Sequence, residues 1–488
     1  MGVKRYTAEA DNTITNAYKP NLRSRATGSN MGLSDSVEVF YIYGQQDSGS
    51  SELSRVLIQF PMTQITTDRT NGVLPASGNV SFHLRMFNAR HPYTLPREYN
   101  MIVSTVSRAW NEGTGLDMED YSNSGSSNWT TAASASSGVT AWTTEGGDYH
   151  AEPRFTASFE DGTEDIEIDV SDAVERWLAG SRDNYGFGVR MEDETALSSS
   201  YTKKFFARGT EFFFRRPLIE ARWDSATRDD RGNFYFSSSL ATSEDNLNTV
   251  YLYNHVRGRL RDIPDIGTGS IHVSIYSGSA DNSEPTGSRI VKVVDGTHVI
   301  TDNPYVVTGG HVSTGIYSAS FALTAASNPL TTAFDVWHSG TTQFATSSFS
   351  PKKLESLAYN PYSRYVINIT NLRDRYYRNE TAQFRLYSRN KDWQPTIYVK
   401  ASAVPENNLV ESGSYKVVRI VDNLDVIPFG TGSDNHTQLS YDVSGSYFDL
   451  DIDMLEAGYS YGIKFAFYDD GAQSWNEYPD IFKFRVEE

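Results

Sequence analysis

The sequence has no cysteine in its 488 residues. A disulfide framework, a thiol nucleophile and a cysteine-ligated metal are therefore excluded. No run of residues approaches the roughly 18 consecutive apolar positions that a membrane-spanning helix needs, so we expect no membrane insertion. Basic residues are also in the minority, with 43 Lys and Arg against 61 Asp and Glu and a formal net charge of −18. Because phosphate binding requires clustered Lys and Arg, we expect no nucleic-acid partner.

Recognised targeting and catalytic motifs are missing as well. The Lys4-Arg5 pair near the start is not followed by an apolar run, so we expect no secretory signal and a protein that stays in the cytosol until it is released. Gly-x-Ser-x-Gly, Walker A, Rossmann and zinc-binding spacings do not occur. We therefore predict that the protein is not an enzyme and carries no catalytic residues, no cofactor and no metal.

One acidic cluster leaves open the alternative that the chain binds a metal ion. Its members alternate along a predicted strand and could supply hard oxygen ligands to Ca²⁺. The same alternation is typical of a solvated strand face, and the spacing matches neither an EF-hand nor a calcium-binding repeat. The cluster comprises Asp161, Glu164, Asp165, Glu167 and Asp169.

The residues that are abundant are those of strands and turns, including 30 Tyr, 25 Phe and 36 Gly. Short apolar or alternating runs bounded by turn residues recur along the chain and predict strands. In the first part of the chain they are Val37–Tyr43, Arg55–Phe60, Val80–Phe87, Ile102–Ser107, Asp165–Val170, Phe187–Met191 and Pro217–Trp223. Helical periodicity is scarce and predicts one short helix over Ser171–Leu178, with Ser171 or Asp172 as N-cap. The fold class is therefore all-β.

The length predicts more than one domain, because a single core stops growing near about 250–300 residues. A charged segment that ends in glycine, Asp224–Gly232, marks a first boundary, and Ala401–Asn408, which contains Pro405, marks a second. We expect a jelly-roll β-sandwich over residues 1–223, a further β-sandwich over 224–402 and an immunoglobulin-like or fibronectin-like domain over 403–488. In the last domain, Leu455, Gly458 and Tyr461 form the Leu-x-x-Gly-x-x-Tyr pattern of a tyrosine corner.

Two loop motifs in the first domain are candidates for carbohydrate binding. Trp110 and Glu112 lie in a Trp-Asn-Glu-Gly sequence after a predicted strand, and Trp142 and Asp148 lie in a Trp-x-x-x-Gly-Gly-Asp loop. A sugar ring stacks its apolar face on an aromatic side chain while carboxylates accept hydrogen bonds from its hydroxyls. The alternative is that the tryptophans close the core, Glu112 caps a loop and Asp148 holds a turn.

An ordered series of motifs in residues 1–223 resembles the DNRLRE-type domain, a jelly-roll module related to disaggregatase repeats and grouped with carbohydrate-binding modules. The series covers nearly half of the chain. It includes Asp11-Asn12-Thr13-Ile14, Ser29-Asn30-Met31-Gly32, Ser54-Arg55-Val56-Leu57-Ile58-Gln59-Phe60, Trp110-Asn111-Glu112-Gly113, Asn184-Tyr185-Gly186-Phe187 and Arg216-Pro217-Leu218-Ile219-Glu220. The resemblance implies the jelly-roll fold and a surface able to bind a glycan.

The rest of the chain resembles the C-terminal regions of structural proteins of tailed phages of aquatic bacteria. The motifs concerned include Phe384-Arg385-Leu386-Tyr387-Ser388-Arg389, Lys391-Asp392-Trp393, Ser440-Tyr441-Asp442-Val443-Ser444-Gly445 and Phe482-Lys483-Phe484-Arg485-Val486. The resemblance implies an accessory tail, baseplate or neck protein of the virion, assembled in the host cytoplasm. Its expected partners are other virion proteins, copies of itself and a host surface glycan. A free or cell-surface carbohydrate-binding protein is the alternative, and a glycan-cleaving enzyme is the third class.

Overall fold

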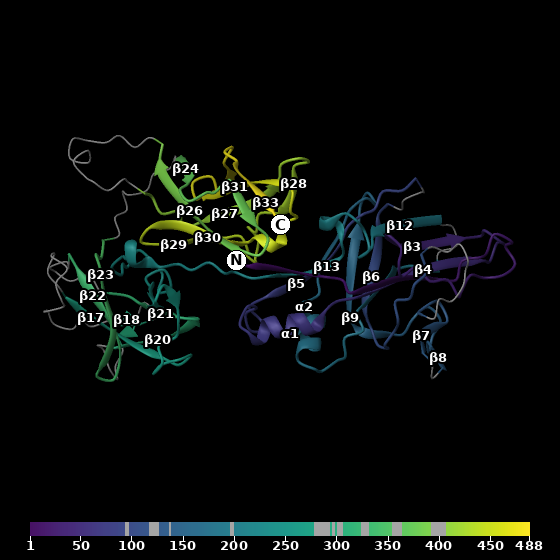
Figure 1. Ribbon diagram of the computed structural model, residues 1–488, viewed down its shortest axis with the longest axis horizontal. Helices are drawn as coiled ribbons and strands as arrows, with labels where there is room; N and C mark the ends of the chain where they lie inside the picture. The colour runs from purple at the N-terminus through teal and green to yellow at the C-terminus, as the bar shows by residue number, and fades with distance from the viewer. Residues whose placement is uncertain are drawn as a thin grey trace. The chain divides into compact units, whose positions relative to one another are not determined.

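The computed structural model (Figure 1) describes residues 1–92, 97–116, 126–135, 138–195, 200–277, 293–294, 298–299, 306–323, 331–353, 364–391 and 407–488. Residues 401–406 of the expected second boundary and the Asp392-Trp393 pair of one sequence motif lie outside these residues. The chain forms two compact units. The N-terminal unit comprises Gly2–Asp224 together with Gly432–His436. The C-terminal unit comprises Met1, Ser225–Thr431 and Thr437–Glu488.

The N-terminal unit is a β-sandwich with two helices. One sheet has the strand order β1 (Val3–Thr7), β13 (Leu218–Arg222), β5 (Ser81–Met86), β10 (Ile166–Asp169). The other has the order β12 (Ser200–Phe206), β3 (Ser36–Tyr43), β4 (Ser51–Gln59), β11 (Phe187–Met191), β6 (Tyr99–Val106), β9 (Tyr149–Phe159), and β2 (Ala10–Thr15) also pairs with β4. A hairpin of β7 (Thr131–Ala135) and β8 (Gly138–Ala141) and the helices α1 (Met62–Thr70) and α2 (Ser171–Leu178) complete the unit.

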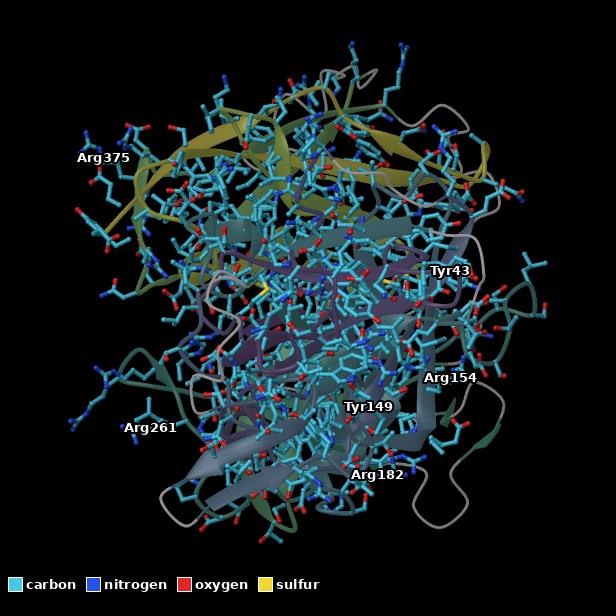
Figure 2. The ribbon with its side chains drawn as sticks, turned by 90° about the vertical axis from the view of Figure 1, so that its right-hand side faces the viewer. Tyr43, Tyr149, Arg154, Arg182, Arg261 and Arg375 are labelled. Carbon is cyan, nitrogen blue, oxygen red and sulfur yellow. The ribbon has the colours of Figure 1, made fainter. Side chains whose placement is uncertain are left out.

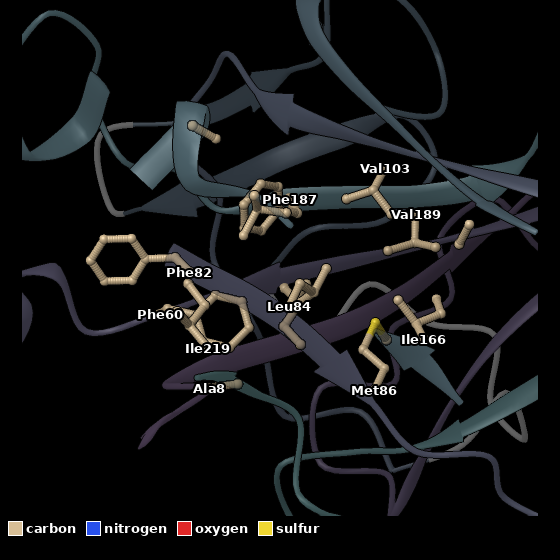
Figure 3. Close-up of a cluster of buried hydrophobic side chains, with 14 of the residues drawn as sticks. Ala8, Phe60, Phe82, Leu84, Met86, Val103, Ile166, Phe187, Val189 and Ile219 are labelled. Atoms are coloured by element: carbon tan, nitrogen blue, oxygen red, sulfur yellow. The ribbon is translucent and has the colours of Figure 1, made fainter. Parts of the chain in front are cut away.

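The core of this unit lies between the two sheets, because alternate residues of each strand point to the same side. Along β5 the pattern alternates, and Phe82, Leu84 and Met86 are buried. Figure 3 shows these three side chains in one cluster with Phe187 and Val189 of the opposite sheet. The strands predicted for this unit from an alternation of apolar and polar residues are confirmed, and β11 has the predicted bounds.

The predicted helix is also confirmed over its full length, but its cap is not as expected. Helix α2 spans Ser171–Leu178, buries Val174 and Trp177, and is followed by Gly180 with φ +66°. The N-cap is Val170, and no side chain caps the helix. The Ser171 hydroxyl instead accepts a hydrogen bond from the backbone N–H of Phe82 at 2.8 Å. The prediction of Ser171 or Asp172 as N-cap was wrong because a neighbouring strand uses the hydroxyl that would have capped the helix.

The first part of the C-terminal unit is one antiparallel sheet. Its order is β14 (Asn248–Tyr253), β21 (Ile316–Phe321), β20 (Val307–Ser313), β17 (Ile271–Ser277), β22 (Ala333–Ser339), β23 (Thr342–Phe349). Two short hairpins accompany it, β15 (His255–Val256) with β16 (Arg259–Leu260) and β18 (Val293–Val294) with β19 (His298–Val299). Phe234 packs on Phe321 and Phe349 with ring centroids 5.4 and 4.6 Å away, and these rings form part of the buried core of this region.

The second part of this unit is a sandwich of two sheets. One has the order β24 (Tyr365–Ile369), β26 (Thr381–Asn390), β30 (Gly445–Asp451), β29 (Ser440–Asp442). The other has the order β25 (Arg375–Tyr377), β33 (Phe482–Glu487), β31 (Ser460–Asp469), β27 (Gly413–Arg419), β28 (Leu424–Ile427), with β32 (Ser474–Glu477) paired to β31. Aromatic rings fill the space between the sheets, and Phe448 stacks on both Tyr415 and Phe384 with centroid distances of 4.0 and 5.1 Å.

The division of strands differs from the expected one at residue 402. Strands β24 and β26 pair in one sheet with β30, and β25 pairs in parallel with β33 near the end of the chain. These three strands precede the expected boundary but belong to the C-terminal sandwich. The sequence could not reveal this, because a pairing between distant strands leaves no local pattern.

The tyrosine corner has the hydrogen bond that its sequence pattern predicts. The Tyr461 hydroxyl donates to the backbone carbonyl of Glu456 at 2.8 Å, five residues upstream, and Gly458 has φ +88°. Together, these elements confirm an all-β, multidomain sandwich architecture. The more specific immunoglobulin-like assignment stays a prediction.

Candidate functional site

Trp110 lies inside the N-terminal unit. Its indole is 8% exposed and packs with Ile14, Leu57 and Val106 in a second, smaller apolar cluster. The indole N–H donates to the backbone carbonyl of Tyr185 at 2.8 Å. The ring therefore has both its apolar surface and its one polar group occupied by the protein.

Trp142 belongs to the same cluster. It is 6% exposed, and its indole N–H donates to the carbonyl of Asn128 at 2.8 Å. Between these two tryptophans in the sequence lies Trp129, also buried, whose ring has the guanidinium of Arg55 at 5.2 Å from its centroid. The structure thus brings Trp110 and Trp142 together, in a core cluster rather than on an open platform.

The Glu112 carboxylate is held by an arginine side chain and by a backbone N–H group. Its carboxylate forms a bidentate ion pair with Arg208 and accepts a hydrogen bond from the backbone N–H of Asp11 at 2.8 Å. Charge-assisted bidentate pairs of this kind fix both partners in one geometry. Glu112 therefore ties the start of β2 to the loop that follows β12.

Asp11 adjoins this pair and was not among the predicted site residues. Its Oδ2 accepts from the backbone N–H of Arg208 at 2.6 Å, and its buried Oδ1 has no hydrogen-bond partner. Burial raises the pKa of Asp11 to about 7. The N–H of Arg208 opposes the rise and the nearby Glu112 carboxylate adds to it. Asp11 begins the Asp11-Asn12-Thr13-Ile14 motif, which is one of those that carry the resemblance to the DNRLRE-type domain.

Asp148 closes the loop that follows Trp142. Its carboxylate accepts hydrogen bonds from the backbone N–H groups of Thr143 at 2.9 Å and Thr144 at 3.0 Å, and from Arg108 Nε at 2.7 Å. Burial on its own raises the pKa of Asp148, but these donors outweigh it and lower the pKa. Gly146 and Gly147 have φ of +88° and +108°.

The four candidate residues therefore have structural roles in this conformation. Two close an apolar cluster, one joins two segments and one holds a turn. The same loop is fastened at Gly146, whose carbonyl accepts hydrogen bonds from the Tyr149 hydroxyl and from Arg55; Figure 2 labels Tyr149. These contacts favour the alternative interpretation of the four as core and turn residues, and their role in carbohydrate binding stays a prediction.

A buried carboxylate holds together the other sheet of the N-terminal unit. Glu220 on β13 contacts Arg5 at 2.6 Å, Arg222 at 2.7 Å and Arg85 at 3.3 Å, and it is almost fully buried. Burial alone would raise its pKa, but the three guanidiniums lower it far below the ordinary range of a glutamate. Such a carboxylate stays ionised at any physiological pH and is a poor proton donor or acceptor. Glu220 therefore has a structural role at the centre of an ion-pair cluster.

The described part of the chain contains neither a candidate metal site nor a candidate membrane-spanning helix. Among these residues, no three His, Asp or Glu side chains come close enough together to hold a metal ion. Nor do the described segments include a helix whose length and apolar character would let it cross a membrane.

A cavity of about 520 Å³ lies in the C-terminal unit, and none of the four residues nominated for carbohydrate binding lines it. Tyr253, Arg385, Tyr415 and Tyr447 are among the residues that line it. They come from β14, β26, β27 and β30, which are far apart in the sequence. Tyrosines are frequent throughout the chain, so composition gave no signal that these four would meet.

Comparison with known proteins gives little guidance. No family model and no curated protein matches the sequence. Among solved structures, Salmonella alpha-2-macroglobulin reacted with methylamine is similar at 9% identity and a TM-score of 0.15, over 99% of this chain and 26% of that one. Dimeric latent PorU from Porphyromonas gingivalis is similar at 11% identity and a TM-score of 0.15, over 99% of this chain and 34% of that one.

The chain thus spans between a quarter and a third of the length of these two solved chains. TM-scores this low carry no argument about fold or function. The resemblances to the DNRLRE-type domain and to tailed-phage structural proteins stay predictions.

Proposed function

We propose that the chain is a non-enzymatic structural protein of a tailed-phage virion, an accessory component of the tail, baseplate or neck. One observation carries the proposal: the side chains that would be the first candidates for chemistry are used to hold the strands and loops of the N-terminal β-sandwich together. Glu112 is paired with Arg208, and Glu220 is surrounded by three arginines. A chain whose charged side chains stabilise its own fold in this way is suited to forming contacts with other proteins.

The modular architecture supports the same role. Several all-β modules follow one another, and each offers edge strands and loops for contacts with other virion proteins or with copies of this chain. Particles gain strength from many modest interfaces acting together, so each contact can be weak. Weak contacts with a host surface glycan are part of the proposal, as the resemblance of residues 1–223 implies.

The test is mass spectrometry of purified virions of the phage that encodes the chain, together with immunogold labelling. We expect the chain at a fixed copy number relative to the major capsid protein, with label on one part of the particle. Its absence from washed, gradient-purified particles would overturn the proposal. That result would favour the alternative, a free or cell-surface carbohydrate-binding protein.

The alternative function has a separate test at Trp142. If its ring stacks on a sugar, Trp142→Ala abolishes glycan retention and leaves the melting temperature unchanged. Because the ring is buried and its N–H is hydrogen-bonded, we expect a loss of stability of about 3–5 kcal/mol instead, as for other buried tryptophans cut back to alanine. Thermal unfolding of the full chain distinguishes the two outcomes.

A further inference from the structure

Lys203 of β12 lies in the interior of the N-terminal unit. Its side chain is 0% exposed, and its Nζ lies 5.1 Å from the ring centroids of both Phe159 and Phe205. A lysine is almost never fully buried unless its charge is compensated by the groups around it. The contacts of Nζ therefore decide what this amine does.

The Lys203 amine donates hydrogen bonds to three carbonyl oxygens. Two belong to the backbone, Gly162 at 2.9 Å and Glu164 at 2.8 Å, and the third is Oδ1 of the Asn88 side chain at 2.7 Å. A C=O bond is about 1.2 Å long, so Nζ lies no more than about 4 Å from the carbonyl carbon of Asn88. Reacting atoms in a near-attack geometry are about 3–3.5 Å apart. A small shift therefore brings the amine to reacting distance from this carboxamide.

The backbone fixes Asn88 opposite Lys203. Asn88 follows β5 and forms an antiparallel bridge with Phe205 of β12. Two backbone hydrogen bonds, of 3.0 and 2.9 Å, join the residues on either side of Asn88 to β12. A reaction between two groups held in this way is unimolecular, so the fold has already met much of its entropic cost.

Burial also favours the nucleophilic form of the amine. It lowers the pKa of Lys203 to about 8, although the charges of Glu164 and Asp165 oppose the shift. About a tenth of the amine is therefore neutral at pH 7. The Glu164 carboxylate, on the loop before β10, has a buried Oε2 without a hydrogen-bond partner in the described part of the chain. A base is thus present near the amine to accept its proton.

We propose that Lys203 and Asn88 form an intramolecular isopeptide bond. Nζ of the neutral amine attacks Cγ of Asn88, a C–N bond forms, and the bond between Cγ and Nδ2 breaks. One amine proton passes to the leaving nitrogen, which departs as ammonia, so no oxidant and no further reactant is needed. Asn88 is half-buried, which gives the ammonia a route to solvent. Of the three described contacts of Nζ, only Asn88 can react in this way, because attack on a backbone carbonyl would cleave the chain.

The bond joins the two sheets of the N-terminal sandwich. Lys203 is on β12 of one sheet, and Asn88 follows β5 of the other. The two residues are 115 positions apart, and a covalent link across so long a loop stabilises the fold chiefly by restricting the unfolded chain, as a disulfide does. The chain has no cysteine, so an amide bond gives it a cross-link that reducing conditions do not break. The inference does not depend on the virion assignment.

The test is the intact mass of the purified full-length chain, incubated overnight above pH 8 so that most of the Lys203 amine is neutral. We expect a mass that is lower than the mass of the sequence by one ammonia. Tryptic digestion should then yield a branched peptide in which residues 86–90 are linked to the peptide that contains Lys203. An unchanged mass overturns the proposal. A mass deficit without the branched peptide, as from a succinimide at another asparagine, overturns it as well.

Substitutions at the two reacting residues assign the bond. Asn88→Ala and Lys203→Met should each have the mass of their sequence and give no branched peptide. The matched control is Lys204→Met, because Lys204 is the next residue of β12 and pairs with Glu38 at 3.4 Å. This control should keep the loss of ammonia. Loss of ammonia that persists in Asn88→Ala would overturn the proposal. The unmodified chain remains the decisive sample if either variant folds poorly.

Discussion

Asp11 gives the N-terminal unit an unusual dependence of stability on pH. Burial raises the pKa of its carboxyl group from 3.8 to about 7, so the folded chain binds a proton that the unfolded chain has released. The favourable contribution is therefore complete below pH 3.8 and is lost as the pH rises through about 7. This sign is opposite to that of a salt-bridged carboxylate such as Glu220.

The size of the effect follows from the two pKa values. The rise from 3.8 to about 7 spans about three units, and at 1.36 kcal/mol per unit the ionised carboxylate costs about 4 kcal/mol above pH 7. Substitution Asp11→Asn removes the ionisation. The amide oxygen can still accept from the N–H of Arg208, and the amide N–H₂ can donate to the Glu112 carboxylate.

We therefore expect Asp11→Asn to stabilise the N-terminal unit, and to do so by about 2–3 kcal/mol more at pH 8 than at pH 5. The measurement is hydrogen exchange of the β4 amides in the full-length chain, resolved by mass spectrometry of peptides. It reports the opening free energy of this unit without requiring the whole chain to unfold in one step.

The control is Asp161→Asn, because Asp161 is exposed on a loop of the same unit. It should change β4 protection by less than about 0.5 kcal/mol at either pH. A destabilising effect of Asp11→Asn at pH 8, or a gain of the same size at pH 5 and pH 8, would refute the reasoning. Either result would mean that the pKa of Asp11 in the folded chain is not raised above its value in the unfolded chain.

Three further predictions concern other buried polar groups. Glu220→Gln should destabilise the N-terminal unit by about 3–5 kcal/mol at pH 7, measured by exchange of the β13 amides, because it leaves the buried Arg222 and the half-buried Arg5 and Arg85 without their central carboxylate. Tyr461→Phe should cost about 0.5–1.5 kcal/mol in the protection of β31, the value of one hydrogen bond to Glu456. Burial lowers the pKa of His436 from 6.5 to about 4. The neutral imidazole therefore contributes about 3 kcal/mol of stability above pH 6.5, and this contribution is lost as the pH falls towards 4. His436→Leu should remove that acid sensitivity from the exchange of β13, and an unchanged pH profile would contradict the assignment.

Local patterns predicted the elements whose packing is itself local. Strand β11 and helix α2 have the expected bounds because each presents one strong apolar face to a single core. Helix α1 was missed, since its sequence is rich in threonine and buries only Ile65. The assignment of β24–β26 to the C-terminal sandwich depends on pairings with β30 and β33, which no local pattern encodes.

The candidate sites illustrate a deeper limit of sequence reasoning. Motifs nominated Trp110 and Asp148 as groups able to bind a ligand, and in the fold their polar atoms are already bonded to the protein. No motif nominated Tyr415, whose buried hydroxyl has no partner. A sequence shows which residues could form hydrogen bonds, whereas binding requires hydrogen-bonding capacity that the fold leaves unused. That remainder is set by contacts between strands from distant parts of the chain, so no local pattern shows it.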